Sequence, residues 1–487
     1  MNSQERQEET AYDVAVIGAG TAGIPAAIAA AQGGARVLLV EKDSLIGGTL
    51  HVTGGHMAAA GTRRQSSRGI EDSVEQHLAD IRRISQGTAR DDLIQIQVAN
   101  AADTVDWLDE RGFAFAPETP RIVYGHEPYT VARTYYGKDE GQSILEVLRA
   151  ELEKARESHD LTLWTSTPAL EIRKDDTGRV CGVSVFKNGQ EVDVDAPSVV
   201  IATGGFGADS ELFEELEGAP LVSASGRAAT GDGIHLGRAA GAGLQGQGTY
   251  LPTFGGLPDP KTPGRANWSD RQRLTSERPP LEIYVNTDGK RWVAEDEPSI
   301  DEKERALTTI PQRTFWTVFD DAMLEASTGA LEMVVGCEPD QVRAMANNRV
   351  GVHRADDLSE LAALAGIDPE GLVSTVARYN DQVARGVDED FGRTHLPMPI
   401  EKGPYYAIRN HAITLVTFTG LDIDTDFTVR SAAGERIEGL YAVGEVIGAG
   451  ATCGNSFCSG MLVTPALTFG RLLGERLSAG ATASRSS

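Results

Sequence analysis

The apolar segments at the start of the chain have the lengths and order of a βαβ unit. The run Val14–Ile17 is wholly apolar and leads into GAGTAG (residues 18–23). An Ala/Ile-rich stretch at residues 22–31 has helical character, and a second β-branched run, residues 36–40, ends at Glu41. Short continuous apolar runs on either side of a helix are typical of buried parallel strands. The pattern therefore predicts an α/β fold that begins with strand, helix and strand.

The glycines in this unit predict a dinucleotide site. Gly18 makes the tight turn, Gly20 lets the backbone approach a pyrophosphate, and Gly23 lets the helix pack on the sheet. The N–H groups at the helix N-terminus then face the diphosphate. Glu41, about 20 residues on, can accept a hydrogen bond from a ribose hydroxyl.

The remaining pattern predicts a discontinuous nucleotide-binding domain. We expect helices near residues 73–84, 91–108, 143–152 and 464–477, and a β-meander at 161–199. The composition changes to Pro-, Gly- and Trp-rich segments near residue 246, and strand-to-glycine elements return after 398. We therefore predict a first part at 1–245, an inserted cap domain at 246–398 and a second part at 399–487.

A polar loop rich in aromatic residues, residues 121–141, precedes one of these helices. It gathers six side chains of chemical interest: Tyr124, His126, Tyr129, Arg133, Tyr135 and Tyr136. One interpretation is a tyrosine-lined surface loop. The other is a wall of a substrate pocket, since loops on a rigid scaffold often carry function.

Charge and cysteine usage limit the partners and the location. The net charge of −26 disfavours nucleic acid and anionic membranes. We find no run of 18 apolar residues and no secretory signal in MNSQERQEET, and so expect no membrane span and a cytoplasmic location. Four cysteines are too few in a chain of this length to indicate a set of structural disulfides, and the spacing of Cys453 and Cys458 does not suggest a metal site. We expect no bound metal.

A set of motifs resembles the flavoprotein family of fumarate reductases, succinate dehydrogenases and 3-ketosteroid dehydrogenases. Besides GAGTAG with Glu41, the matching motifs are GGTLHVTGG (47–55), ATGGF (202–206), TGDGI (230–234), VNTDGKRW (285–292), GLYAVGEV (439–446) and TPALTFGR (464–471). The resemblance implies a Rossmann-like FAD-binding domain with a mobile α+β cap over the flavin ring.

By that likeness a set of residues would bind FAD. Glu445 would hold the ribityl chain, Ala169 would sit near the adenine, and the last helix would direct its N-terminus at the flavin C2 carbonyl. The full set is Gly18, Gly20, Thr21, Ala22, Gly23, Glu41, Lys42, Gly47, Gly48, Thr49, Thr53, Gly54, Gly55, Ala169, Ala202, Thr203, Gly204, Asp232, Gly444, Glu445, Ser459, Met461 and Leu462. Gly48 aligns with the histidine that tethers the flavin in succinate dehydrogenases, so we expect non-covalent FAD.

The departures from the family pattern concern basic residues. The positions at which fumarate-type members carry His or Arg are Leu251, Ser299, Leu415 or Val416, and Asn455 here. A dianionic substrate would lack its usual bidentate partners. The segment NSFCSGM (455–461) instead resembles ketosteroid dehydrogenases, in which it contacts the substrate carbonyl. Phe457 stands at the Tyr position, and Ser459 and Gly460 are retained.

Three functional hypotheses follow. The first is α,β-desaturation of a cyclic ketone, of the ketosteroid or 4-oxocyclohexanecarboxylate type. Ser459 and Gly460 would hold the carbonyl, Tyr135, Tyr136 or His126 would be the base, and Arg133 would bind a substrate carboxylate. The second is the reverse reaction, an enone or enoate reductase. The third is a non-enzymatic flavoprotein. The most specific form of this hypothesis makes Cys453 and Cys458 a redox pair. The electron acceptor (oxygen, a quinone or a redox protein) stays open.

Overall fold

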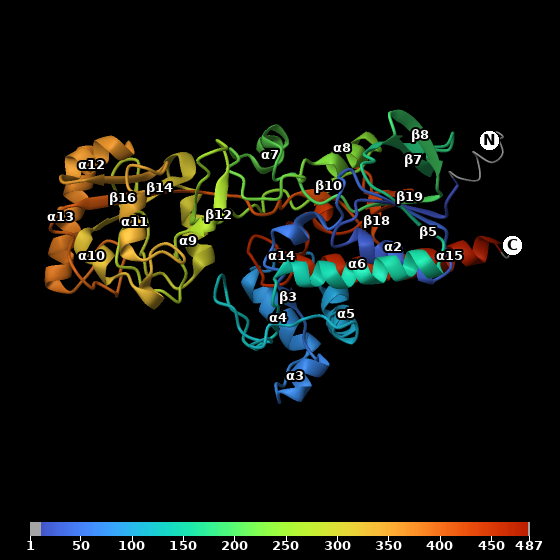
Figure 1. Ribbon diagram of the computed structural model, residues 1–487, viewed down its shortest axis with the longest axis horizontal. Coiled ribbons are helices and arrows are strands. Elements are labelled where there is room, and N and C mark those ends of the chain that lie inside the picture. Colours follow the sequence, from blue (N-terminus) through green and yellow to red (C-terminus); the bar gives the residue numbers. More distant parts are fainter. Residues whose placement is uncertain (1–10, 486–487) are drawn as a thin grey trace.

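A six-stranded sheet lies at the centre of the larger half of the molecule in the computed structural model, which describes residues 11–485 (Figure 1). The strand order is β18 (Thr428–Arg430), β19 (Arg436–Ala442), β9 (Ser198–Ile201), β1 (Val14–Ile17), β2 (Val37–Val40) and β5 (Leu161–Trp164). The pairs from β19 to β5 are parallel, and β18 pairs antiparallel with β19. The predicted βαβ start is confirmed.

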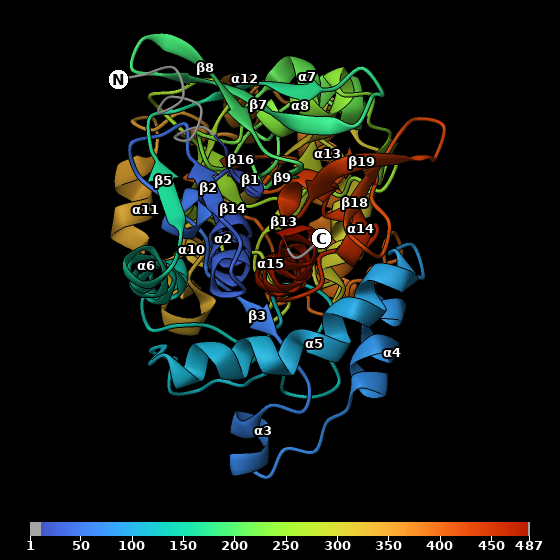
Figure 2. The ribbon, with the colours of Figure 1, turned by 90° about the vertical axis from the view of Figure 1, so that its right-hand side faces the viewer.

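Helices cover one face of this sheet and a small antiparallel sheet covers the other. The helices α2 (Gly23–Gln32), α6 (Gly141–Ser158) and α15 (Val463–Arg485) lie side by side, seen nearly end-on in Figure 2. On the opposite side, β7 of the sheet β6 (Ala169–Lys174), β7 (Val180–Lys187) and β8 (Gln190–Asp195) packs on β9 and β19. The predicted meander is therefore this three-stranded sheet, while β5 and β9 at its ends join the parallel sheet.

A helical extension forms the lower part of Figure 1 and contains α3 (Arg63–Ser67), α4 (Val74–Ile84) and α5 (Asp91–Glu110). Ser73 caps α4, because its side chain accepts a hydrogen bond from the Gln76 N–H. Both longer helices match the predicted ranges closely. The strands β3 (Met57–Ala58) and β4 (Thr134–Tyr135) pair antiparallel and connect this extension to the loop at residues 121–133.

The second half, yellow and orange in Figure 1, is an antiparallel sheet covered by short helices. Its strand order is β13 (Ile283–Asn286), β14 (Thr314–Asp320), β16 (Tyr405–His411) and β15 (Val352–Ala355). Its helices are α9 (Ile300–Leu307), α10 (Asp321–Ala326), α11 (Pro339–Met345), α12 (Leu358–Ala365) and α13 (Pro369–Arg385). The last four surround a separate hydrophobic core, and α9 packs in a smaller one. An α+β cap was predicted here. However, β16 lies beyond the predicted boundary at 398 and pairs fully with β14, so the cap's sheet uses residues on both sides of that boundary.

The remaining short helices and strands are α7 (Ser210–Glu217), α8 (Asp232–Ala239), β10 (Leu244–Gln245), β11 (Gly256–Pro258), β12 (Ala266–Arg271), β17 (Gly420–Leu421) and α14 (Gly450–Cys453). Among residues 11–485, no helix has both the length and the apolar character that a membrane crossing needs. The first ten residues, on which the expected lack of a secretory signal depends, lie outside the described part.

Candidate active site

A cavity of about 1370 Å³ extends from the carboxyl ends of β1 and β2 to α9 of the cap. Its lining includes Gly18 and Glu41 at one end and Ile300 and Phe457 at the other. Ordinary ligand pockets measure about 300–1,000 Å³. The cavity therefore has room for a large cofactor and a second molecule.

The glycine motif shapes the first end of the cavity. Gly18 has φ +103°, and a Cβ there would lie 2.5 Å from the Ala202 carbonyl oxygen. A Cβ on Gly23 would lie 1.8 Å from the Gly18 oxygen, whereas one on Gly20 would have no protein atom within 4 Å. Gly18 and Gly23 are thus required by the protein's own packing. Gly20 opens onto the cavity, where a pyrophosphate can approach the N-terminus of α2.

Two acidic side chains border this end. Glu41 accepts hydrogen bonds from the N–H groups of Ala19 and Asp43, both at 2.9 Å. A carboxylate has about four acceptor sites, so Glu41 can still accept from a ribose hydroxyl. Asp232, at the start of α8, accepts a hydrogen bond from Lys42 at 2.9 Å. This bond joins the end of β2 to the TGDG turn.

Most of the residues that the resemblance assigns to FAD line this one cavity. They are Gly18, Gly20, Thr21, Ala22, Glu41, Lys42, Gly48, Thr49, Thr53, Gly54, Gly55, Ala169, Ala202, Thr203, Gly204, Asp232, Gly444, Glu445, Ser459 and Leu462. Three others support it without lining it: Gly23 packs against Gly18, Gly47 faces Leu145, and Met461 is fully buried.

The lining fits a flavin nucleotide. The hydroxyl of Thr203 is buried at the cavity and has no hydrogen-bond partner in the described part of the protein. Glu445 is held by the N–H and hydroxyl of Thr417, at 3.0 and 3.2 Å, and burial raises its pKa. The first turn of α15 borders the cavity at Leu462 and Val463, where helix N–H groups favour negative charge on a reduced ring.

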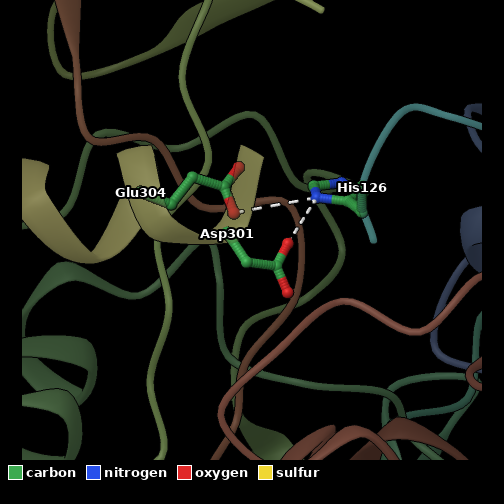
Figure 3. A group of neighbouring side chains, drawn as sticks. All are labelled: His126, Asp301 and Glu304. Atoms are coloured by element: carbon green, nitrogen blue, oxygen red, sulfur yellow. Dashed lines mark ion pairs between the residues drawn. The ribbon is translucent and has the colours of Figure 1, made fainter. Parts of the chain in front are cut away.

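Three ionisable side chains, His126, Asp301 and Glu304, lie together at the cap end of the cavity (Figure 3). His126 lines the cavity, and its Nδ1 lies 3.3 Å from Asp301 Oδ1 and 3.7 Å from Glu304 Oε2. Both carboxylates belong to α9 and are fully buried. Figure 3 shows the two side chains pointing from that helix toward the imidazole.

The electrostatics of these three residues are tightly linked. Burial lowers the pKa of His126, but the charges of Glu304 and Asp301 outweigh it, so the net shift is upward. Burial raises the pKa of Glu304 to about 8, against the opposing effect of His126. The sequence analysis found His126 but not its partners. Asp301 and Glu304 lie some 175 positions away, and their spacing matches no familiar motif.

The segment before α15 forms the adjoining wall. The Phe457 ring lies against His126, the Ser459 hydroxyl lies 3.2 Å from the Thr134 hydroxyl, and Tyr129 donates to the Ser459 carbonyl at 2.6 Å. Gly460 has φ +77°, and a Cβ there would lie 2.3 Å from the Ala58 nitrogen. Phe457, Ser459 and Gly460 all line the cavity, together with His126.

The two tyrosines predicted as a catalytic base and the arginine predicted to bind substrate lie elsewhere. Tyr135 is fully buried with its hydroxyl 2.6 Å from that of Thr62, and Tyr136 donates to Glu118 at 2.6 Å. Arg133 is fully buried between Asp72, at 2.8 Å, and Asp80, at 2.7 Å. In the described residues none of the three predicted side chains lines the large cavity. The tyrosine pair and Arg133 are therefore not placed to act as base or carboxylate ligand.

The positions of the missing basic residues are apolar or structural. Leu251 is buried, Leu415 and Val416 line the cavity, and Ser299 caps α9. Arginines from other positions do reach the cavity, which the sequence analysis missed: Arg227, Arg265, Arg271, Arg273 and Arg278. Arg273 and Arg278 pair with Glu332 and Glu282. The other three form no ion pair within 4 Å in the described part of the chain.

Comparisons with known proteins agree with this geometry. A fumarate reductase (cytochrome) of Shewanella frigidimarina is 31% identical over 469 residues, which covers 95% of this chain and 76% of that protein. A 4-oxocyclohexanecarboxylate 2-dehydrogenase of Sinomonas cyclohexanicum is 28% identical, covering 96% and 92%. A 3-ketosteroid Δ1-dehydrogenase structure from Sterolibacterium denitrificans shares the fold, with a TM-score of 0.79 at 23% identity over 97% of this chain and all of that one.

These findings confirm the resemblance, the fold and the cofactor. The family described as "FAD binding domain" matches residues 13–462, nearly the whole chain. The cavity that this segment encloses has the glycine turn, the acidic strand end and the helix N-terminus that such a cofactor needs. The chain belongs to the FAD binding domain family and is an FAD-dependent oxidoreductase.

Proposed function

We propose that the protein desaturates a ketone, and that the substrate is a cyclic ketone of the ketosteroid or 4-oxocyclohexanecarboxylate type. The observation that carries this proposal is the position of His126. It is an imidazole at the cavity wall, backed by two buried carboxylates, and it faces the segment with Ser459 and Gly460.

The roles follow from this arrangement. Ser459 and the Gly460 backbone hold the carbonyl oxygen, where negative charge develops when the α-proton leaves. His126 accepts that proton, and Asp301 stabilises the imidazolium that results. FAD, when bound, accepts the β-hydrogen as hydride. Phe457 and Ile300 give the cavity an apolar wall that excludes water from the reacting carbons.

The reverse reaction is a second candidate, favoured by two observations. The relative at 31% identity is a fumarate reductase, and three arginines without carboxylate partners in the described chain line the cavity. Arg227, Arg265 and Arg271 could bind an anionic group on an enoate. In this direction His126 would donate the proton, and electrons would reach the flavin from a separate donor.

The two directions can be separated without turnover. The oxidised protein is mixed anaerobically with saturated cyclic ketones, including 4-oxocyclohexanecarboxylate, and flavin absorbance is followed. Bleaching by ketones, lost in His126→Ala while FAD stays bound, is the expected result. Bleaching that is unchanged in His126→Ala would remove this residue from the reaction. Reoxidation of reduced protein by enones or enoates, with no bleaching by ketones, would favour the reductase.

The flavin attachment, acceptor and location belong to the same proposal. We propose non-covalent FAD, a cytoplasmic enzyme, and oxygen, a quinone or a redox protein as acceptor. Gly48 offers no nucleophile, but His51 and His56 also line the cavity. Acid precipitation should therefore release all the FAD into the supernatant. Yellow colour in the pellet would indicate a covalent bond to one of these histidines.

A further inference from the structure

The acidic corner, formed by His126, Asp301 and Glu304, contains an unusual number of unsatisfied atoms. His126 Nδ1, both Asp301 oxygens and both Glu304 oxygens are buried and form no hydrogen bond of good geometry in the described residues, although Nδ1 lies within ion-pair distance of one oxygen of each carboxylate. Buried polar atoms in native proteins nearly always have such a partner. A group of five in one place indicates a ligand that the protein atoms alone do not supply.

The charge balance points to a cation. Asp301 and Glu304 are both 0% exposed, and His126 is the basic group within 4 Å of them in the described chain. One imidazolium can offset only one of two carboxylate charges. In the absence of a second cation, burial raises the pKa of Glu304, because a second uncompensated buried charge would cost several kcal/mol. A dication would offset both, with the imidazole neutral and free to coordinate.

The distances fit a metal ion. The three donor atoms lie within 4.8 Å of one another, and two of the separations are 3.3 and 3.7 Å. Two ligands about 2.1 Å from a zinc ion at the tetrahedral angle are about 3.4 Å apart. One nitrogen and two carboxylates, with a cavity on the open side, form a donor set that zinc accepts and that the oxygen-preferring Mg²⁺ and Ca²⁺ do not favour.

We propose that the acidic corner binds one divalent transition ion of the Zn²⁺ type, which joins the loop at residues 121–133 to α9 of the cap. The ligands come from both halves of the molecule, so the ion would hold the cap against the flavin domain. It would also inhibit the proposed function, because a dication bound to Nδ1 lowers the proton affinity of Nε2, the ring nitrogen left to accept the α-proton. Binding itself does not depend on that function.

The test uses the full-length, FAD-loaded protein without substrate. It is stripped with EDTA, equilibrated with Zn²⁺, passed through gel filtration and assayed for metal, with thermal unfolding measured in parallel. We expect one Zn²⁺ per chain and a higher unfolding temperature. Asp301→Asn and Glu304→Gln, which keep the side-chain size, should weaken zinc binding at least tenfold and abolish the temperature increase.

A surface histidine gives the matched control. His235 lies 3.8 Å from Asp209 on the exposed surface, so His235→Ala removes a similar pair outside the cavity and should leave zinc binding unchanged. Equal zinc retention by wild type and Glu304→Gln would overturn the proposal, as would no retained zinc or equal binding of Mg²⁺. If zinc fails to bind while ketones still bleach the flavin, the zinc site is rejected and the proposed ketone desaturation is retained.

Discussion

The ring of His126 lies against the ring of Phe457, with centroids 4.7 Å apart and planes tilted by 30°. Phe457 is in turn fixed by Phe418, which meets it edge-on at 5.4 Å. Residues from three distant parts of the chain therefore set the orientation of one imidazole. This aromatic support holds Nδ1 toward the carboxylates of α9, which is the arrangement on which the proposed chemistry depends.

Removing this support should impair proton transfer more than flavin binding. Phe457→Leu keeps an apolar side chain but removes the aromatic contact, which is worth about 0.5–1.5 kcal/mol. We expect kcat to fall by about tenfold with FAD content unchanged, measured by ketone turnover and flavin absorbance. Phe457→Tyr keeps the ring and serves as the control. A kcat for Phe457→Leu equal to that of wild type would show that the ring position does not matter.

Ser459 should contribute through its hydroxyl. One preorganised donor at a developing oxyanion is worth about 3 kcal/mol, so Ser459→Ala should lower kcat about 100-fold. Thr134→Val removes the hydroxyl 3.2 Å from Ser459 Oγ and should have a smaller effect, because it alters only the donor's orientation. Steady-state kinetics on the same ketone compare the two. A larger loss in the Thr134 variant would assign the carbonyl contact to Thr134 instead.

Arg133 should matter for stability and not for substrate affinity. Its guanidinium is fully buried and forms a bidentate pair with Asp72 and a further bond to Asp80. Arg133→Met would leave the buried Asp72 carboxylate without its cation and Asp80 with Arg83 alone, at a cost of about 3–5 kcal/mol. Urea unfolding should record that loss, while KM stays the same. A raised KM with unchanged stability would return Arg133 to the substrate site.

Most residues predicted for the flavin end line one cavity, because local rules govern this part of the chain. The turn at Gly18, the helix behind it and Glu41 lie within one supersecondary unit, so their spacing alone fixes their chemistry. The main helices were predicted for a similar reason, since each carries a continuous apolar face. Burial of whole segments can be inferred from a pattern of this kind.

The cap end could not be predicted in the same way. His126 meets Asp301 and Glu304 only because the cap folds over the flavin domain, and no periodicity encodes that contact. The same limit explains Arg133. The neighbours of Arg133 in sequence suggested a polar loop. Its ion-pair partners Asp72 and Asp80, however, come from the preceding helical extension. Aromatic crowding near residue 130 thus reflected packing and not a tyrosine base.

The cap should lose stability in mild acid through His411, at the end of β16. Burial lowers the pKa of this imidazole to about 4, and Arg409 adds to the shift. Its folded pKa lies below the unfolded value of about 6.5, so the stabilisation is complete above pH 6.5 and is lost as the pH falls toward 4. The resulting loss in the free energy of unfolding is at most about 3 kcal/mol. His411→Gln should give a flatter curve of unfolding free energy over that range, and exposed His235→Gln should match wild type. Parallel curves for wild type and His411→Gln would show that the group does not titrate as described.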